Sequence, residues 1–355
     1  MLEARFSAGA GPGGVAIPGG GPFLRAAWGE NGRRAPIWIM RQAGRYLPEY
    51  RALKARSNFL EMVRTPELAA EITLQPIRRF PLDAAIIFSD IMTPLEALGV
   101  EIAFTPGPHV AEPLRSPAQI EALRLPEGPI APFVGEALRL VRAELSEDVG
   151  LIGFAGAPLT LAAYLVEGSG SKEYEHFRAF LRAEPAALHA LLEKLTVVTI
   201  DYLKMQIAAG AQAVQIFDSW AGLHDLPTYR TFGIPYYRRI LEALDGLGAA
   251  RIFFALGASH LTSAIAELPC EVVGVDWRTD LRAARSAFGT RALQGNLDTA
   301  VLYADATTLE KEAQAVLAAG RGGAHIFNLG HGIWPDVAPD AVARLVEIVH
   351  GFDRS

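Results

Sequence analysis

Eight short apolar runs, separated by longer helical patterns, constrain the fold of this chain more than any other feature of its sequence. They are rich in β-branched and aromatic residues and lie at 37–40, 84–88, 151–154, 213–217, 252–255, 272–275, 292–294 and 325–328. Strands that are apolar on both faces and alternate with helices indicate a parallel sheet covered by helices. Eight such units favour a closed α/β barrel, the (βα)8 TIM barrel, over an open doubly wound sheet.

The segments between these runs carry helix and turn signals that fit one barrel domain over residues 22–355. Thr65 and Ser116 each precede a proline, the pattern of an N-cap followed by proline in the first turn. Pro76 is expected to kink the first of these helices or end it early. Residues 100–108 predict an inserted hairpin beside the barrel mouth. The glycine- and proline-rich stretch within residues 1–21 is expected to be a disordered leader outside the fold.

Composition excludes several classes of function. The formal net charge is −6, which argues against a nucleic-acid binder that works through a broad basic surface. Cys270 is the only cysteine, so an internal disulfide framework and a zinc site with more than one thiolate are excluded, and a reducing cytoplasm is expected. No uninterrupted apolar run is as long as a membrane span.

Arg41 and Arg45 lie where the first apolar run gives way to a helix that begins near Pro48. Ala43 and Gly44 between them let the backbone approach a ligand. Two arginines on a short loop form a fork for carboxylate or phosphate groups. The alternative is that one arginine merely pairs with a nearby acid such as Glu49.

Other polar residues follow later strands on the same, carboxyl side: Asp90, Tyr164, Asp218 with Ser219, and His331. In a βα barrel this face carries the loops that build the active site, so these residues are expected to converge at one mouth.

Each of these residues also has a structural interpretation. Asp90 and Ser219 have the chemistry of helix caps, and a tyrosine in an alanine-rich helix is more often part of the core. His331 lies between two glycines on a loop, which favours a functional role.

Two long motifs resemble the signatures of the uroporphyrinogen decarboxylase family: PIWIMRQAGRYLPEYR at 36–51 and GFAGAPLTLAAYLVEG at 153–168. Shorter matches lie at 87–91, 215–222, 294–298 and 328–333, so the resemblance extends from about Phe23 to the C-terminus.

The resemblance implies a βα barrel, usually a homodimer, that acts on a small-molecule substrate without a cofactor. Such enzymes remove carbon dioxide from the four acetate side chains of uroporphyrinogen III and give coproporphyrinogen III. By position, the family's active-site residues correspond to Arg41, Arg45, Asp90, Tyr164, Ser219 and His331, with Gln42 and Phe217 lining the pocket and Ala43 and Gly44 in the binding loop.

The roles expected from this chemistry are specific. Asp90 accepts hydrogen bonds from the pyrrole N–H groups and stabilises a cation that develops on the ring. Tyr164 orients Asp90 through its hydroxyl, and Arg41 grips a carboxylate or holds a water that donates a proton. Arg41 and Arg45, with His331, explain how an acidic protein can bind a substrate with eight carboxylates.

Two other functions remain open from the sequence alone. One is a zinc-dependent methyltransferase acting on corrinoid or thiol substrates, although no histidine lies at a ligand-like spacing from Cys270. The other is a tetrapyrrole-binding protein without catalytic activity.

Overall fold

The computed structural model describes residues 20–104 and 107–354. The first nineteen residues of the expected leader lie outside these ranges. Gly20 and Gly21 belong to the described fold, because Gly21 is the N-cap residue of α1 (Pro22–Ala27) and the Gly20 carbonyl accepts a hydrogen bond from Arg25 at 3.0 Å. The described fold therefore includes two residues before residue 22.

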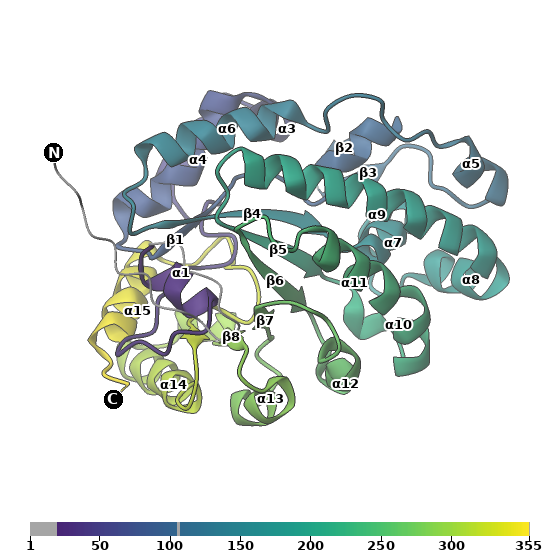
Figure 1. Cartoon of the computed structure of the whole chain (residues 1–355). Coiled ribbons are helices and arrows are strands. Elements are labelled where there is room, and N and C mark those ends of the chain that lie inside the picture. The colour runs from purple at the N-terminus through teal and green to yellow at the C-terminus, as the bar shows by residue number, and fades with distance from the viewer. Residues whose placement is uncertain (1–19, 105–106, 355) are drawn as a thin grey trace, which may run out of the picture.

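A parallel sheet of seven strands forms the centre of the molecule (Figure 1). Its order is β1 (Ala84–Ile86), β4 (Gly150–Gly156), β5 (Ala213–Asp218), β6 (Ala250–Ala255), β7 (Val272–Gly274), β8 (Ala292–Gln294) and β9 (His325–Ile326). Every residue of β4 and β6 is buried, as expected for strands covered on both faces. The predicted α/β class with a parallel sheet is confirmed.

The first predicted strand, at 37–40, does not join this sheet as a full strand. Only Ile37 is paired, through a parallel bridge to Phe327. The Phe327 N–H donates to the Pro36 carbonyl at 2.8 Å, the Trp38 N–H donates to the Phe327 carbonyl at 3.4 Å, and the Asp83 N–H donates to the Ile37 carbonyl at 2.8 Å. The segment therefore lies between β9 and β1 and contacts both.

Side chains explain why this segment forms no ladder. The N–H groups of Ile37, Ile39 and Met40 donate to Asp83 Oδ2, Gln42 Oε1 and Asn328 Oδ1 at 2.8, 3.0 and 2.9 Å. Those N–H groups are therefore not available to a neighbouring strand. The expected count of eight regular strands was wrong by this one segment.

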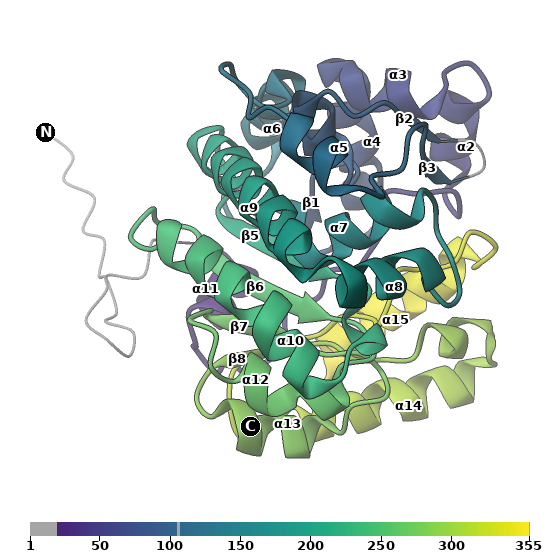
Figure 2. The ribbon, with the colours of Figure 1, turned by 90° about the vertical axis from the view of Figure 1, so that its right-hand side faces the viewer.

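Helices surround the strands, as Figure 2 shows from the end of the sheet. Helices α1 and α15 lie at one end of the view in Figure 1, and the loops leading to α7, α8 and α10 lie at the other. The α-helices after α1 are α2 (Pro48–Lys54), α3 (Phe59–Arg64), α4 (Pro66–Arg79), α5 (Pro117–Ala122), α6 (Pro132–Glu144), α7 (Pro158–Glu167), α8 (Glu175–Ala183), α9 (Pro185–Ala208), α10 (Leu226–Phe232), α11 (Ile234–Ala243), α12 (Thr262–Ile265), α13 (Leu281–Phe288), α14 (Ala306–Ala319) and α15 (Pro339–Gly351). Short 3₁₀ turns are η1 (Thr93–Leu98), η2 (Ala221–Leu223), η3 (Ser259–Leu261) and η4 (Thr299–Tyr303).

The helix starts predicted at Thr65 and Ser116 are confirmed. Ser116 Oγ accepts a hydrogen bond from the Gln119 N–H, whereas Thr65 makes no side-chain cap. The expected early end at Pro76 was wrong, since α4 continues to Arg79. Pro76 is buried and lies close to the helix end, and its carbonyl still accepts from the Phe80 N–H at 2.9 Å. Packing of α4 against α6 offsets the one hydrogen bond that proline removes.

The predicted hairpin is also confirmed. Strands β2 (Ile102–Phe104) and β3 (Pro108–Val110) pair antiparallel, and the turn residues 105 and 106 lie outside the described ranges. The Val110 N–H donates to the Gly168 carbonyl at 2.7 Å, which attaches the hairpin to the end of α7.

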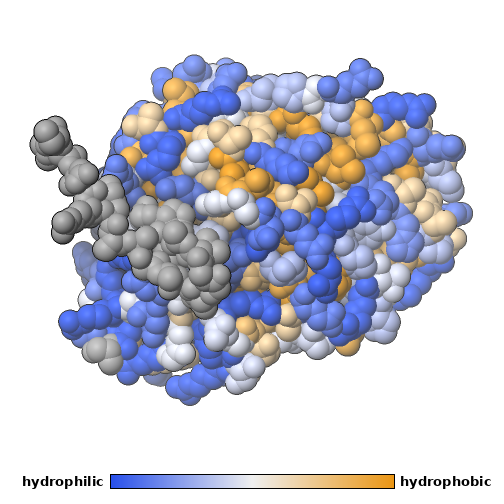
Figure 3. All heavy atoms as spheres, viewed as in Figure 1, coloured by the Kyte–Doolittle hydropathy of each residue, from blue (hydrophilic) through white to orange (hydrophobic). Residues whose placement is uncertain are grey.

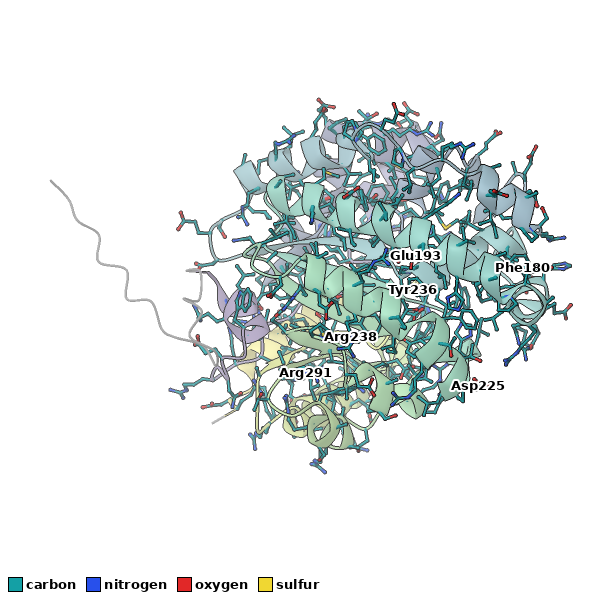
Figure 4. All side chains as sticks on the ribbon, turned by 45° about the vertical axis from the view of Figure 1, so that its right-hand side comes forward. Phe180, Glu193, Asp225, Tyr236, Arg238 and Arg291 are labelled. Carbon is teal, nitrogen blue, oxygen red and sulfur yellow. The ribbon has the colours of Figure 1, made fainter. Side chains whose placement is uncertain are left out.

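The outer surface carries both hydrophobic and hydrophilic residues. Figure 3 shows hydrophobic residues among hydrophilic ones in the region of α9. Figure 4 shows Glu193 on α9 and Tyr236 and Arg238 on α11 along the outside of the molecule. Across the described part of the chain, none of the helices combines the length and the apolar character needed to cross a membrane.

Burial of His325 predicts a measurable dependence of stability on pH. Its side chain has no exposed surface, its Nε2–H donates to the Gly295 carbonyl at 2.7 Å, and burial lowers its pKa from 6.5 to about 3. Between these values the unfolded chain binds a proton that the folded chain does not, so stability falls as pH falls below 6.5.

We expect the free energy of unfolding contributed by His325 to drop by roughly 1 kcal/mol from pH 7 to pH 5.5. Urea unfolding of the wild type and of His325→Gln at both pH values measures this term, because glutamine keeps an N–H donor but does not titrate. An equal pH dependence in both proteins would contradict the assignment.

Candidate active site

The arginine loop is held in an unusual backbone conformation. Arg41 has a φ of 63°, in the left-handed region that residues other than glycine rarely adopt. Its neighbour Met40 is fixed on both sides, because its N–H donates to Asn328 Oδ1 at 2.9 Å and its carbonyl accepts from the Ile333 N–H at 2.9 Å. Strained residues of this kind cluster at functional sites, where the surrounding structure holds them in place.

The side chain of Gln42 stabilises this loop from within the protein core. Its side chain is completely buried, with Oε1 accepting from the Ile39 N–H and Nε2 donating to the Ala84 carbonyl, both at 3.0 Å. Gln42 was predicted to bind substrate, but the structure does not bring its amide to the surface of the site. Ala43 and Gly44 lie in the turn between the two arginines, where the Gly44 carbonyl accepts from the Leu47 N–H at 3.0 Å.

Arg41 and Arg45 have exposed side chains, and neither forms a salt bridge with residues of 20–104 or 107–354. The alternative pairing with Glu49 is wrong, because Glu49 Oε1 accepts instead from Arg79, with Nε at 2.9 Å. Both guanidinium groups are therefore available to bind an anion. The positive charge of Arg45 opposes the rise in the pKa of Tyr50, which lies on α2. The Arg45 side chain therefore lies toward α2.

Asp90 lies in the loop after β1 and retains some exposed surface. Its Oδ1 accepts one hydrogen bond from the Met92 N–H at 2.9 Å within the loop. The capping interpretation is wrong, because Met92 is the N-cap residue of η1 and no side chain caps that turn. Burial raises the pKa of the Asp90 carboxyl, while the hydrogen bond from Met92 and the charge of Arg41 oppose that shift. Asp90 and Arg41 thus lie within electrostatic reach of each other.

Tyr164 lies on α7 and is half-buried. Its ring packs edge-on against Tyr174 and Trp220, with centroids 6.1 and 5.8 Å away. Burial raises the pKa of its hydroxyl, and the charges of Asp90 and Arg41 act on it in opposite directions. The phenol therefore lies near both charged groups.

His331 lies between two glycines that are required by close packing. A Cβ atom at Gly330 would overlap the backbone of Trp277, and one at Gly332 would overlap the side chain of Arg41. Burial lowers the pKa of His331, and the charge of Arg41 lowers it further. Both effects disfavour the protonated imidazole in the free protein.

The carboxyl end of β5 contributes an aromatic wall and a buried carboxylate. Phe217 is partly exposed and packs edge-on against Phe154 and Phe254 at 5.6 and 5.9 Å. Asp218 is buried and accepts hydrogen bonds from three hydroxyls, those of Thr160 at 2.6 Å, Tyr229 at 2.9 Å and Tyr237 at 2.8 Å. Asp218 is thus a structural residue, and Ser219 follows it directly at the end of β5.

Several residues near the site were missed by sequence reasoning. Asn328 and Trp220 lie inside recognised motifs, and their contacts follow only from the fold. Tyr202, on α9, is buried with its hydroxyl 3.4 Å from Ser89 Oγ, next to Asp90. A tyrosine in a long apolar helix carries no sequence signal that separates it from ordinary core residues.

No metal centre is evident in the described ranges, where no group of three or more His, Cys, Asp or Glu side chains is arranged to hold an ion. Cys270 is buried, and burial raises the pKa of its thiol to about 11. Such a thiol is a poor metal ligand, because metals bind the thiolate.

The chain is thus an α/β protein. At the carboxyl ends of its strands, the charge of Arg41 acts on Asp90, and both charges act on Tyr164. The family model described as uroporphyrinogen decarboxylase (URO-D) matches residues 21–352. The uroporphyrinogen decarboxylase of Geobacter sp. (strain M21) is 45% identical over 335 residues, which cover 94% of this chain and 98% of the relative. That of Geotalea daltonii is 46% identical with the same coverage. The chain belongs to the uroporphyrinogen decarboxylase family.

A solved methyltransferase from Methanosarcina mazei has a related structure. It superposes with a TM-score of 0.79 over 93% of this chain and 98% of its own, at 22% sequence identity. At that identity the likeness supports the fold alone. The much higher identity to the decarboxylases does not favour a methyltransferase function for this chain.

The buried amide of Gln42 predicts a specific loss of stability. Gln42→Ala leaves the Ile39 N–H and the Ala84 carbonyl without partners, and each such group costs about 1–3 kcal/mol. We expect unfolding by urea to show a loss of at least about 2 kcal/mol. Gln119→Ala, on the exposed start of α5, is the control. Equal stability of the two variants would contradict the role given to Gln42.

Proposed function

We propose that this chain is an enzyme that decarboxylates the four acetate side chains of uroporphyrinogen III and releases coproporphyrinogen III without a cofactor. The observation that carries the proposal is the electrostatic coupling of Asp90, Arg41 and Tyr164 at one end of the sheet. The relatives named for this activity, at about 45% identity over nearly the whole chain, support it.

Decarboxylation requires a group that accepts the electron pair of the broken C–C bond. When an acetate loses carbon dioxide, the electron pair of the broken C–C bond must move into the pyrrole ring. Protonation of the ring at its α-carbon makes it a cation that accepts this pair. A second proton then completes the methyl group and the first leaves the ring. An anion beside the ring nitrogens lowers the energy of the cation.

Asp90 is our candidate for this anion. One of its oxygens is fixed by the Met92 N–H, which leaves the other for the pyrrole N–H groups. In a site with few water molecules a fixed carboxylate stabilises a cation more strongly than in bulk water. The hydroxyl of Tyr164, which lies near Asp90, is our candidate for orienting the carboxylate or the ring.

Arg41 and Arg45 are our candidates for binding the substrate carboxylates. Both are free of protein carboxylates within the described ranges, so substrate binding does not require an existing ion pair to break. An arginine is a poor general acid at its ordinary pKa, so a water held by Arg41 is the better candidate for the proton donor.

The remaining candidate residues have smaller roles. Phe217 is proposed as an apolar wall for the macrocycle, and Ser219 and His331 as hydrogen-bonding groups. Ala43 and Gly44 are proposed to let the arginine loop approach the substrate. Gln42 is proposed to act only by positioning Arg41, because its amide is fully used by the backbone.

We also propose that residues 22–355 form one domain with the closed (βα)8 barrel architecture. The hydrogen bonds of residues 36–38 to Phe327 on one side and Asp83 on the other support closure between β9 and β1. The expected homodimer and the cytoplasmic location stay predictions.

Turnover separates this function from its alternatives. Purified protein with uroporphyrinogen under anaerobic conditions should release carbon dioxide and form coproporphyrinogen with no added metal or cofactor. Tight binding of the macrocycle without release of carbon dioxide would favour a tetrapyrrole carrier instead.

Removal of the Asp90 charge should abolish most of this activity. We expect Asp90→Asn to lower kcat by about a hundredfold or more, because asparagine keeps an acceptor for the Met92 N–H but loses the counter-charge. Asp201→Ala, on the exposed face of α9, is the control. A near-normal rate for Asp90→Asn, with circular dichroism unchanged, would remove Asp90 from the mechanism.

Loss of Arg41 should weaken binding as well as rate. A hydrogen bond to a charged group contributes about 1.5–3 kcal/mol, so Arg41→Ala should raise KM by about tenfold or more and also lower kcat. Steady-state kinetics measure both. If KM and kcat were both unchanged, Arg41 would not hold a substrate carboxylate.

A further inference from the structure

A third arginine near the site, Arg278, is held on the turn that follows β7. Its guanidinium carbon lies 3.9 Å from the centre of the Trp277 ring, a cation–π contact. Its Nη1 donates to Asp276 Oδ2 at 2.9 Å. About half of the side chain, 53%, remains exposed.

The turn that carries Arg278 is rigidly built. The Asp276 carboxylate is completely buried and accepts hydrogen bonds from the N–H groups of Gly257 at 2.7 Å and Arg278 at 3.1 Å and from the Thr279 hydroxyl at 3.2 Å. Asn296 Nδ2 donates to the carbonyls of Asp276 at 2.8 Å and Thr279 at 2.6 Å. Arg278 is therefore presented from a preorganised support, and little side-chain entropy is lost when it binds a ligand.

The turn lies on the far side of His331 from Arg41. The Trp277 and His331 rings are 6.3 Å apart and packed edge-on, and Gly330 lies against the Trp277 backbone. Gly332, on the other side of His331, lies against Arg41. The charge of Arg278 reaches His331, as does that of Arg41. Positive charge therefore lies on both sides of the same imidazole.

The positions of the substrate carboxylates give a reason for placing arginines on both sides of His331. Uroporphyrinogen carries carboxylates on all four rings, so they surround the macrocycle. Arg41 and Arg45 belong to one loop and reach one edge of such a molecule. Carboxylates at another edge would enter a protein of net charge −6 without a local cation. A guanidinium on the far side of His331 supplies a cation there and lowers the electrostatic cost of binding those carboxylates.

We infer that Arg278, supported by Trp277 and Asp276, is a substrate-binding residue that receives a carboxylate of the macrocycle on the side opposite Arg41. This inference rests on the proposed function. Within the described ranges Nη1 is the only guanidinium nitrogen of Arg278 with a hydrogen bond to protein, so the other N–H donors are available to a ligand. Asp276 is too deeply buried to bind the substrate itself and acts by positioning Arg278.

The opposing interpretation is that Arg278 only closes its own turn. The two interpretations differ in what Arg278→Gln changes. A structural role predicts a lower melting temperature with KM unaffected. A binding role predicts that KM for uroporphyrinogen rises about tenfold, the factor that corresponds to about 1.4 kcal/mol, while kcat stays within about twofold.

The experiment compares wild type, Arg278→Gln and Arg278→Lys with a matched control. The control is Arg239→Gln on α11, because Arg239 is similarly exposed and pairs at 2.6 Å with Glu193, which Figure 4 shows on the outside of the molecule. Anaerobic kinetics give KM and kcat. Fluorescence titration with uroporphyrin, the oxidised macrocycle with the same eight carboxylates, gives Kd without turnover.

The inference predicts a higher KM and a higher Kd for Arg278→Gln, an intermediate change for Arg278→Lys, and no change for Arg239→Gln. Unchanged KM and Kd in Arg278→Gln would overturn it, with the decarboxylase function intact. If wild type released no carbon dioxide, the proposed function would fail, and the Kd values for uroporphyrin would still decide whether Arg278 binds the carboxylates.

Discussion

The hydrogen bonds that hold residues 36–42 between β9 and β1 are the constraint on which the rest of the site depends. Three of them are accepted by side chains: Asp83, Gln42 and Asn328 each accept from a backbone N–H of this segment. A regular strand would end in a flexible loop. Here the side-chain contacts continue to Met40 and Gln42, so Arg41 is held in a left-handed conformation directly beside the glycine loop around His331. The backbone strain at Arg41 is offset by the buried hydrogen bonds of its neighbours Met40 and Gln42.

The charges at the strand ends are only partly paired: Arg278 forms a salt bridge with Asp276, whereas Arg41 and Arg45 form none within the described ranges. Arg41 and Asp90 lie close enough to change the pKa of Asp90, but they form no salt bridge within the described ranges. A direct pair would neutralise the guanidinium and the carboxylate that a charged macrocycle needs. Some arginines away from the site are paired with carboxylates, as in the pairs Arg79–Glu49 and Arg239–Glu193.

Much of this architecture could be predicted from the sequence. Apolar runs placed seven strands within a few residues, because burial on both faces leaves a clear pattern. The runs could not predict that Gln42 and Asn328 replace a strand ladder, since periodicity does not show which side chain turns back to the backbone and the Asn328 contact joins residues remote in sequence. The expected stop at Pro76 failed because tertiary packing outweighs local propensity. The lowered pKa of His331 and the support of Arg278 by Trp277 depend on distances that no periodicity encodes.

The central claim is that one tetrapyrrole touches Asp90 with its nitrogens and the arginines with its carboxylates. A crystal structure of this protein with coproporphyrinogen bound under anaerobic conditions tests it most directly. The account predicts the Asp90 carboxylate within hydrogen-bonding distance of the pyrrole N–H groups and a propionate of the same molecule on Arg41, Arg45 or Arg278. A macrocycle bound elsewhere, or bound here with Asp90 facing away from its nitrogens, would contradict the account.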